Sequence, residues 1–227
     1  MPVLIIILLI VIIVYGPVYW ARYVLKKYNR DQYFSGTGID LARMLLERMN
    51  MQHVKVEETE LGDHYDPEKR IVRLSRENGR KKSLTAVVVA AHEVGHAIQA
   101  HTGYRPLLTR NRMITTAQKM ERLGAILMLV VPLITVITRV PGAGFLILIG
   151  AVINLCVPLA VHLITLPVEF DASRRAKELL LRLGLIQPGE SAAVSKVLNA
   201  AAMTYVASMV TSVLQLVQLL LLARGRD

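Results

Sequence analysis

Cysteine is almost absent from this chain. Only one of its 227 residues is a cysteine, Cys156, so an intramolecular disulfide is excluded. Its chemistry therefore need not take place in an oxidising compartment. Cys156 lies in an apolar run, where packing is sufficient to explain it.

Aromatic and acidic side chains are also scarce. Aromatic residues make up 5% of the chain against 53% hydrophobic residues, and 17 acidic residues stand against 27 basic ones. A mean hydropathy of +0.44 is too high for an ordinary soluble domain. A net charge of +10 is typical of loops held at the cytoplasmic face beside anionic lipid. No RNA- or DNA-binding motif accompanies the charge, so we expect the lipid bilayer as a partner and no nucleic acid.

Four apolar runs are long enough, or nearly so, to cross a bilayer, which takes roughly 17 to 25 residues. The first, 3–20, has neither a basic leader nor a small-residue cleavage site, so we expect an uncleaved anchor and not a signal peptide. The others are 123–138, 142–166 and approximately 200–223, and a short turn at 139–144 joins the second to the third.

Basic residues gather between the first and second runs and again after the third. The positive-inside rule places both segments in the cytoplasm, with the N-terminus and the 139–144 turn outside. Arg224 and Arg226 oppose this arrangement, but the larger asymmetry favours it. We therefore expect a multi-pass protein of the cell's inner or plasma membrane.

The predicted fold is a mainly α membrane protein with about four transmembrane helices and a small cytosolic α+β unit. The predicted divisions are an N-terminal anchor at 1–24, a cytosolic unit at 25–122, a transmembrane hairpin at 123–166, a cytosolic helical segment at 167–199 and a C-terminal transmembrane helix at 200–227.

Local patterns predict the elements of the cytosolic unit. Residues 39–49 look helical, whereas the alternation in 53–60 (HVKVEETE) and the run 70–74 (RIVRL) predict strands. Ser83 is a plausible N-cap for a helix from residue 84 to about residue 100.

That last helix carries AAHEVGHAIQ, residues 90–99. His92 and His96 are four residues apart and share a helix face, so both imidazoles can bind one metal ion. Glu93 directly follows His92 on the helix, so it can form a hydrogen bond to a water on that metal without being a ligand itself. Zinc accepts imidazole nitrogen, lowers the pKa of bound water to about 7 and polarises a carbonyl. The pattern predicts zinc-dependent peptide-bond hydrolysis with Glu93 as the general base.

A core helix that carries two histidines by chance is the alternative. Six histidines and eleven glutamates in this chain would produce the pattern about one time in a hundred. The apolar flank AVVVAA would also leave Glu93 buried and unpaired unless a metal site explained it.

A catalytic zinc needs a third protein ligand. The extension H-E-x-x-H-x-x-G-x-x-H is not met, because Gln99 and Thr102 stand at its glycine and histidine positions. The best candidate is Glu169, in LPVEFDASRRA (166–176), on a new cytosolic helix that begins where Pro167 interrupts the third run. An exposed or salt-bridged glutamate is the alternative. His162, two turns earlier, is either functional or a helix-packing residue.

Several blocks of the chain resemble the bacterial membrane-bound neutral zinc metallopeptidases (YugP-like). They are DHYDP at 63–67, VRLS at 72–75, VAAHEVGHAIQ at 89–99, LPVEFDASRRA at 166–176 and TYVA at 204–207. More distantly, the chain is similar to HtpX-like and CAAX prenyl proteases, which pair H-E-x-x-H with a downstream E-F-x-A-D. This resemblance implies a gluzincin-like protease with a cytosolic active site and Glu169 as the third ligand of one zinc per chain.

The chain departs from the distant relatives at Ser173, where they have an aspartate that orients the ligands. Asp171 and Asp66 are candidates for that role here. In DHYDP, His64 or Tyr65 could donate to an oxyanion, whereas a turn closed by Asp66 and the following proline is the alternative. The strands before the helix could bind an extended substrate as an additional strand.

The predicted function is a membrane-embedded zinc endopeptidase that cuts membrane or membrane-proximal proteins at the cytosolic face; a homo-oligomer is compatible with it. The nearest alternative, an intramembrane-cleaving metalloprotease with 84–100 in the bilayer, is opposed by basic residues on both sides of that segment unless the helix is re-entrant. A metal transporter is also opposed, because it would bind its ion near mid-bilayer on broken helices, whereas the strongest candidate ligands here lie in the predicted cytosolic unit. A non-catalytic metal-binding scaffold would not need Glu93.

Overall fold

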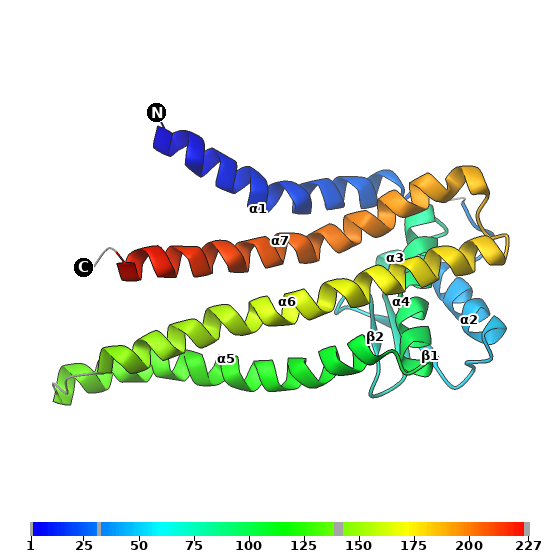
Figure 1. Ribbon diagram of the computed structural model, residues 1–227. Helices are drawn as coiled ribbons and strands as arrows, with labels where there is room; N and C mark the ends of the chain where they lie inside the picture. Colours follow the sequence, from blue (N-terminus) through cyan, green and yellow to red (C-terminus); the bar gives the residue numbers. More distant parts are fainter. Residues whose placement is uncertain (1, 31–32, 139–142, 225–227) are drawn as a thin grey trace.

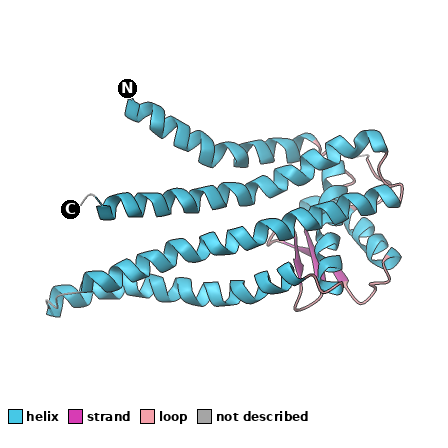
Figure 2. Cartoon of the chain, in the orientation of Figure 1, coloured by secondary structure: helices cyan, strands magenta, loops and turns pink. Residues whose placement is uncertain are grey.

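The computed structural model describes residues 2–30, 33–138 and 143–224, which are mainly helical with one small sheet (Figure 2). In chain order the elements are α1 (Pro2–Lys27), α2 (Gly38–Arg48), β1 (Lys55–Thr59), β2 (His64–Asp66), β3 (Ile71–Ser75), α3 (Arg76–Arg80), α4 (Leu84–His101), α5 (Arg105–Thr138), α6 (Ala143–Arg182), the 3-10 turn η1 (Pro188–Glu190) and α7 (Ser191–Arg224).

Four long helices, α1, α5, α6 and α7, run lengthwise, and the short helices and the sheet gather at one end of them (Figure 1). Three helical segments within the described ranges are long and apolar enough to cross a membrane, namely Leu8–Lys27, Phe145–Arg182 and Pro188–Leu219. Most of the large apolar side chains along α1 are exposed, as expected for a helix whose side chains face the lipid of a bilayer. These features are those of a membrane protein.

The remaining predicted span, 123–138, forms the second half of α5 and is not one of those three segments. Most of the 139–144 turn lies outside the described residues. The fourth span therefore stays a prediction.

The predicted interruption of the third run at Pro167 was wrong. α6 continues through both Pro158 and Pro167 to Arg182. A proline removes one backbone donor from a helix, and the packing of α6 against its neighbours α4, α5 and α7 compensates for that loss. Glu169 thus stands within the candidate span Phe145–Arg182 and not on a new helix.

The sheet has the order β1-β3-β2. β1 pairs with β3 in parallel, and β2 pairs with β3 antiparallel, with Tyr65 opposite Val72. The two predicted strands are confirmed as β1 and β3. The three-residue β2 was missed, because DHYDP has no apolar alternation and reads as a turn.

α4 is the centre of the compact end. Its residues from Leu84 to Gln99 are almost all buried, against α2, the sheet and α6. The predicted helix and its cap are confirmed, since the Ser83 hydroxyl accepts the Ala86 N–H at 3.1 Å. α2 is confirmed within one residue at each end and begins with a capping box formed by Thr37 and Asp40.

Candidate metal centre

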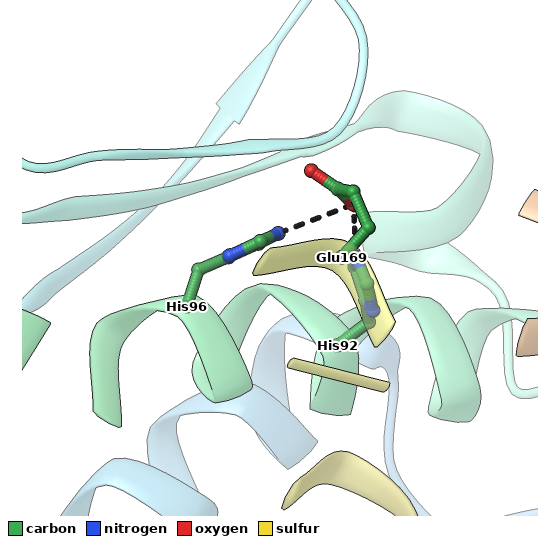
Figure 3. Close-up of side chains that lie close together, drawn as sticks. All are labelled: His92, His96 and Glu169. Carbon is green, nitrogen blue, oxygen red and sulfur yellow. Dashed lines mark hydrogen bonds and ion pairs between the residues drawn. The ribbon is translucent and has the colours of Figure 1, made fainter. Parts of the chain in front are cut away.

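Helices α4 and α6 bring three predicted ligands together (Figure 3). The Nε2 atoms of His92 and His96 lie 3.2 and 3.5 Å from the same atom, Oε2 of Glu169. One ligand atom from each side chain lies within 4.8 Å of the other two. The three side chains are only 12%, 9% and 3% exposed, so the cluster lies inside the protein.

Gly95, between the two histidines, makes this approach possible. A Cβ atom placed on it would lie 2.6 Å from the backbone oxygen of Ala172 on α6. Such a distance is far inside van der Waals contact, so only glycine permits the two helices to pack this closely. The glycine of HEVGH is therefore a packing requirement for Glu169 to reach the histidines.

The donor set fits a zinc ion. Two imidazole nitrogens and one carboxylate, with a further position left for water, are a common ligand set of catalytic zinc. Both nitrogens face a single carboxylate oxygen, and the other oxygen of Glu169, Oε1, is buried without a hydrogen-bond partner. A divalent cation at this point would compensate the buried carboxylate.

His96 is oriented by Gln99. The Gln99 side-chain amide donates to the Val168 carbonyl at 2.8 Å and to the Asp171 carboxylate at 2.9 Å, so its oxygen is left to accept. That oxygen is 3.0 Å from Nδ1 of His96. Nδ1 must then carry the proton, which leaves the lone pair of Nε2 free to bind a metal.

His92 is oriented from α6. Its Nδ1 lies 3.2 Å from the Ser173 hydroxyl. Ser173 is thus the side chain that faces this nitrogen of His92. Of the two other candidates, Asp171 reaches a ligand through Gln99, whereas Asp66 binds the backbone of its own turn and Arg73.

Glu93 lies beside the cluster and is buried. Burial above all, with the nearby charge of Glu169, raises the pKa of Glu93 to about 7, although His92 and a hydrogen bond from the Tyr65 backbone oppose the shift. A carboxyl group that titrates near neutral pH can both accept and release a proton, which suits a general base and acid.

Two cavities meet at the cluster. The larger, about 540 Å³, lies between α1, α4 and α7, and the smaller, about 250 Å³, lies between β2, α4 and α5. The residues that line both are Asp63, His92, Glu93, Glu169 and Tyr205. An extended chain can therefore pass the ligand cluster with its two halves in different cavities.

Residues 3–224 match the family described as "Putative neutral zinc metallopeptidase". The chain belongs to this family. A relative from Bacillus subtilis (strain 168), named "Putative membrane protease YugP", is 36% identical over 220 residues, which cover 93% of this chain and 94% of the relative. No solved structure shows a significant match. The family resemblance inferred from the motifs is thus confirmed, and the buried cluster is consistent with a zinc site.

Sequence reasoning missed two residues of the site, Arg110 and Tyr205. Nη1 of Arg110 is 3.7 Å from Oε1 of Glu169, and Nε of Arg110 is buried without a partner. Tyr205 lies beside the Glu169 carboxylate and lines both cavities. The one available signal for Tyr205 was the block TYVA, which contributed only to the resemblance; Arg110 had none.

The remaining predicted residues lie in different places. His64 and Tyr65 line the smaller cavity, with Nδ1 of His64 2.9 Å from the Gly62 carbonyl oxygen and its Nε2 3.3 Å from Arg73. Asp66 closes its turn, as the alternative reading of DHYDP stated. Among the described residues, His162 lines neither of the two cavities.

Proposed function

We propose that this protein is a membrane-embedded zinc endopeptidase with one zinc per chain, bound by His92, His96 and Glu169. The convergence of these ligands beside the buried Glu93, at the junction of two cavities, is the observation that carries the proposal. Membership of a zinc metallopeptidase family supports it.

The chemistry would be hydrolysis of a peptide bond. Zinc supplies a Lewis acid that lowers the pKa of water toward about 7 and polarises a substrate carbonyl. Glu93 takes the proton of the attacking water as the C–O bond forms, and gives it to the amide nitrogen as the C–N bond breaks. Tyr205, Arg110 and His64 line the same space and can donate to the oxygen on which charge develops.

The substrate would bind in an extended conformation along β2. β2 is an edge strand of the sheet, and Glu93 accepts a hydrogen bond from the Tyr65 backbone within it. An extended chain added beside β2 would place its carbonyl groups next to the ligand cluster. Selectivity would then depend mainly on the cavities on either side.

The active site would face the cytoplasm in a multi-pass protein of the inner or plasma membrane. The gathering of basic residues between the first and second apolar runs, and again after the third, supports this orientation. Membrane proteins or their membrane-proximal segments are the proposed substrates. Neither nucleic acid nor a particular oligomeric state enters the proposal, although the fold is compatible with a homo-oligomer.

Intramembrane cleavage is the less supported alternative. It requires α4 within the bilayer, yet α4 is not among the three candidate spans of the described residues. α4 also packs against α2, α3 and the sheet, which are polar at their outer surfaces. The proposal therefore keeps the scissile bond outside the hydrocarbon core.

The deciding experiment measures zinc content and cleavage of casein, or self-cleavage, by the detergent-purified protein. We expect one zinc and cleavage in the wild type, zinc without cleavage in Glu93→Gln, and loss of zinc in Glu169→Ala. Glu178→Ala is the matched control, because Glu178 lies on the same helix but is exposed and bonded to Arg174. If Glu93→Gln cleaved as fast as the wild type, the protease proposal would be abandoned.

A further inference from the structure

We propose that the larger cavity selects peptide segments that carry an apolar side chain near the scissile bond and an acidic side chain a few residues away from it. This inference rests on the proposed function and adds its substrate class. Its basis is an apolar wall that ends at two unpaired basic residues, Arg22 and Lys26.

The wall of this cavity is built by three helices. Apolar side chains line it from α1, α4 and α7, namely Leu25, Val88, Val89, Val197, Leu198 and Ala201. Its volume of about 540 Å³ lies within the range of roughly 300 to 1,000 Å³ that is usual for ligand pockets. Such a space is suited to a large apolar side chain and the adjoining backbone.

The cavity is continuous with the proposed catalytic residues, since His92, Glu93 and Glu169 also line it. A substrate whose carbonyl group lies at these residues must therefore send the residues on one side of the scissile bond into this space. The smaller cavity would receive the other side.

Two basic side chains at the cavity's α1 side have no acidic partner. Arg22 and Lys26 are four residues apart on α1, so they lie on one face, and both line the cavity. Both are exposed, and within the described residues neither forms an ion pair.

Four acidic side chains among the described residues also line this cavity. Glu93 and Glu169 belong to the proposed catalytic cluster, and the two outside it, Asp63 and Glu77, are already engaged. Asp63 accepts from the backbone of Ser75 and from the side chain of Asn78, each at 2.7 Å. Glu77 accepts from Asn29 at 2.6 Å and from Lys81 at 3.0 Å. The charge left for a ligand is therefore positive, and its complement is a carboxylate.

The position of the pair fits a membrane-proximal segment. Arg22 and Lys26 lie at the end of the candidate span Leu8–Lys27, where a bilayer would give way to water. A substrate that leaves the bilayer beside α1 would present its flanking residues at this level. An anionic lipid headgroup is the competing occupant, and the experiment below separates the two.

The test uses zinc-loaded full-length protein in an uncharged detergent without lipid. Quenched fluorescent peptides with a central leucine carry either glutamate or lysine two to four residues from it, on either side, and products are identified by mass spectrometry. We expect the wild type to prefer a glutamate peptide through a lower KM. Arg22→Glu and Lys26→Glu should each reduce this preference by about tenfold, and added salt should weaken it.

The matched control is Lys27→Glu. Lys27 adjoins Lys26 and carries the same charge, but it lies over the ring of Tyr28, at 5.8 Å, and does not line the cavity. If only the total charge of the protein mattered, the preference for the glutamate peptide would fall equally in all three variants, and the proposal would be overturned. An unchanged preference in Arg22→Glu and Lys26→Glu would also overturn it, as would a charge effect that appears only when anionic lipid is added.

The volume of the cavity is tested separately. Ala201→Leu would fill part of the space, so cleavage next to leucine should fall several-fold while cleavage next to alanine is retained. Ser208→Leu places the same side chain at an exposed position of α7 and should change neither. Equal loss for both peptides in Ala201→Leu would show that the side chain does not occupy this cavity.

The protease proposal and the cavity proposal can fail separately, and the two failures give different results. If the zinc-loaded wild type cleaves no peptide, the protease proposal falls. Fluorescence anisotropy of the same labelled peptides on Glu93→Gln then decides the cavity proposal by itself, because binding of the glutamate peptide must still be weakened by Lys26→Glu and not by Lys27→Glu.

Discussion

At the scale of single residues, Gln99 determines the state of one ligand. Its amide donates to Val168 and Asp171, so its oxygen can only accept, and His96 must place its proton on Nδ1. A carboxylate in this place would impose the same tautomer with a full negative charge. Here the neutral amide of Gln99 contacts His96, and the charged Asp171 contacts Gln99 and not the histidine.

Replacement of Gln99 by leucine should therefore weaken zinc binding without unfolding the helix. The variant keeps a similar volume but leaves Nδ1 of His96 without its acceptor, and it removes the donor to the Val168 carbonyl and to Asp171. Loss of such a supporting group commonly lowers metal affinity by about 10- to 100-fold. Competition with a fluorescent chelator measures the change.

Thr102→Val is the control for that experiment, because the Thr102 hydroxyl bonds only to backbone oxygens at the end of α4. Equal zinc affinities for Gln99→Leu and the wild type would contradict the role assigned to Gln99.

At the scale of secondary-structure elements, the approach of α4 to α6 creates the site. Gly95 faces the backbone of Ala172, so the two helices approach more closely there than any side chain would allow. The side chains of His92 and His96 on α4 can then reach Glu169 on α6. The same approach places Ser173 beside His92.

Gly95→Ala should consequently separate the helices. Alanine favours a helix by about 1 kcal/mol over glycine, but a methyl group 2.6 Å from the Ala172 oxygen costs about 1 to 3 kcal/mol as overpacking and shifts Glu169. We expect a lower melting temperature and weaker zinc binding. Gly189→Ala, where a Cβ atom meets nothing within 4 Å, should change neither.

The turn between β2 and β3 is closed by Asp66. Its carboxylate accepts the backbone N–H groups of Glu68 and Lys69 at 3.1 and 3.0 Å and pairs with Arg73 at 2.8 Å. The Lys69 N–H, followed by Arg73, holds the pKa of Asp66 below its ordinary value. The carboxylate thus stabilises the fold above the pKa of the unfolded chain, and this contribution is lost as pH falls through the lower pKa of the folded chain.

Asp66→Ala should lower the free energy of unfolding by about 1 to 3 kcal/mol at pH 7. The difference from the wild type should begin to shrink below about pH 4, where the carboxyl group of the unfolded chain becomes protonated, and should vanish as pH falls through the lower pKa of the folded chain. Denaturant titration at both pH values measures it. A difference that stays the same in acid would mean that the charge of Asp66 does not stabilise the turn.

At the scale of the whole molecule, the site lies where the long helices meet the compact end (Figure 1). α1 and α7 supply walls of the larger cavity, and α5 supplies Arg110 to the smaller one. The candidate spans are thus part of the substrate-binding region as well as anchors.

The proposed orientation predicts from which side of the membrane a given cysteine can be labelled. In a Cys156→Ser background, Leu61→Cys places a thiol on the loop between β1 and β2, where Leu61 is 86% exposed. A membrane-impermeant maleimide should label it only after the cells are permeabilised. A cysteine added at the N-terminus should be labelled in intact cells. The reverse pattern would place the candidate site outside the cytoplasm.

Short-range patterns predicted much of the site. The spacing of His92, Glu93 and His96 follows from helix geometry, and Glu169 followed from its motif and the family resemblance. Arg110, Tyr205 and the role of Gln99 could not be predicted, because each depends on contacts between helices that are far apart in the sequence. β2 was missed for a related reason, since its pairing with β3 is decided by the sheet and not by its own three residues.

The sequence by itself determined the membrane class, the candidate ligands and the metallopeptidase family, because hydropathy, helical spacing and short motifs are local properties. Only the tertiary structure decided that α6 continues through Pro167, that Gly95 lets Glu169 reach two histidines, and that two cavities of different character meet at Glu93. These features arise from packing between distant segments, which no local pattern specifies.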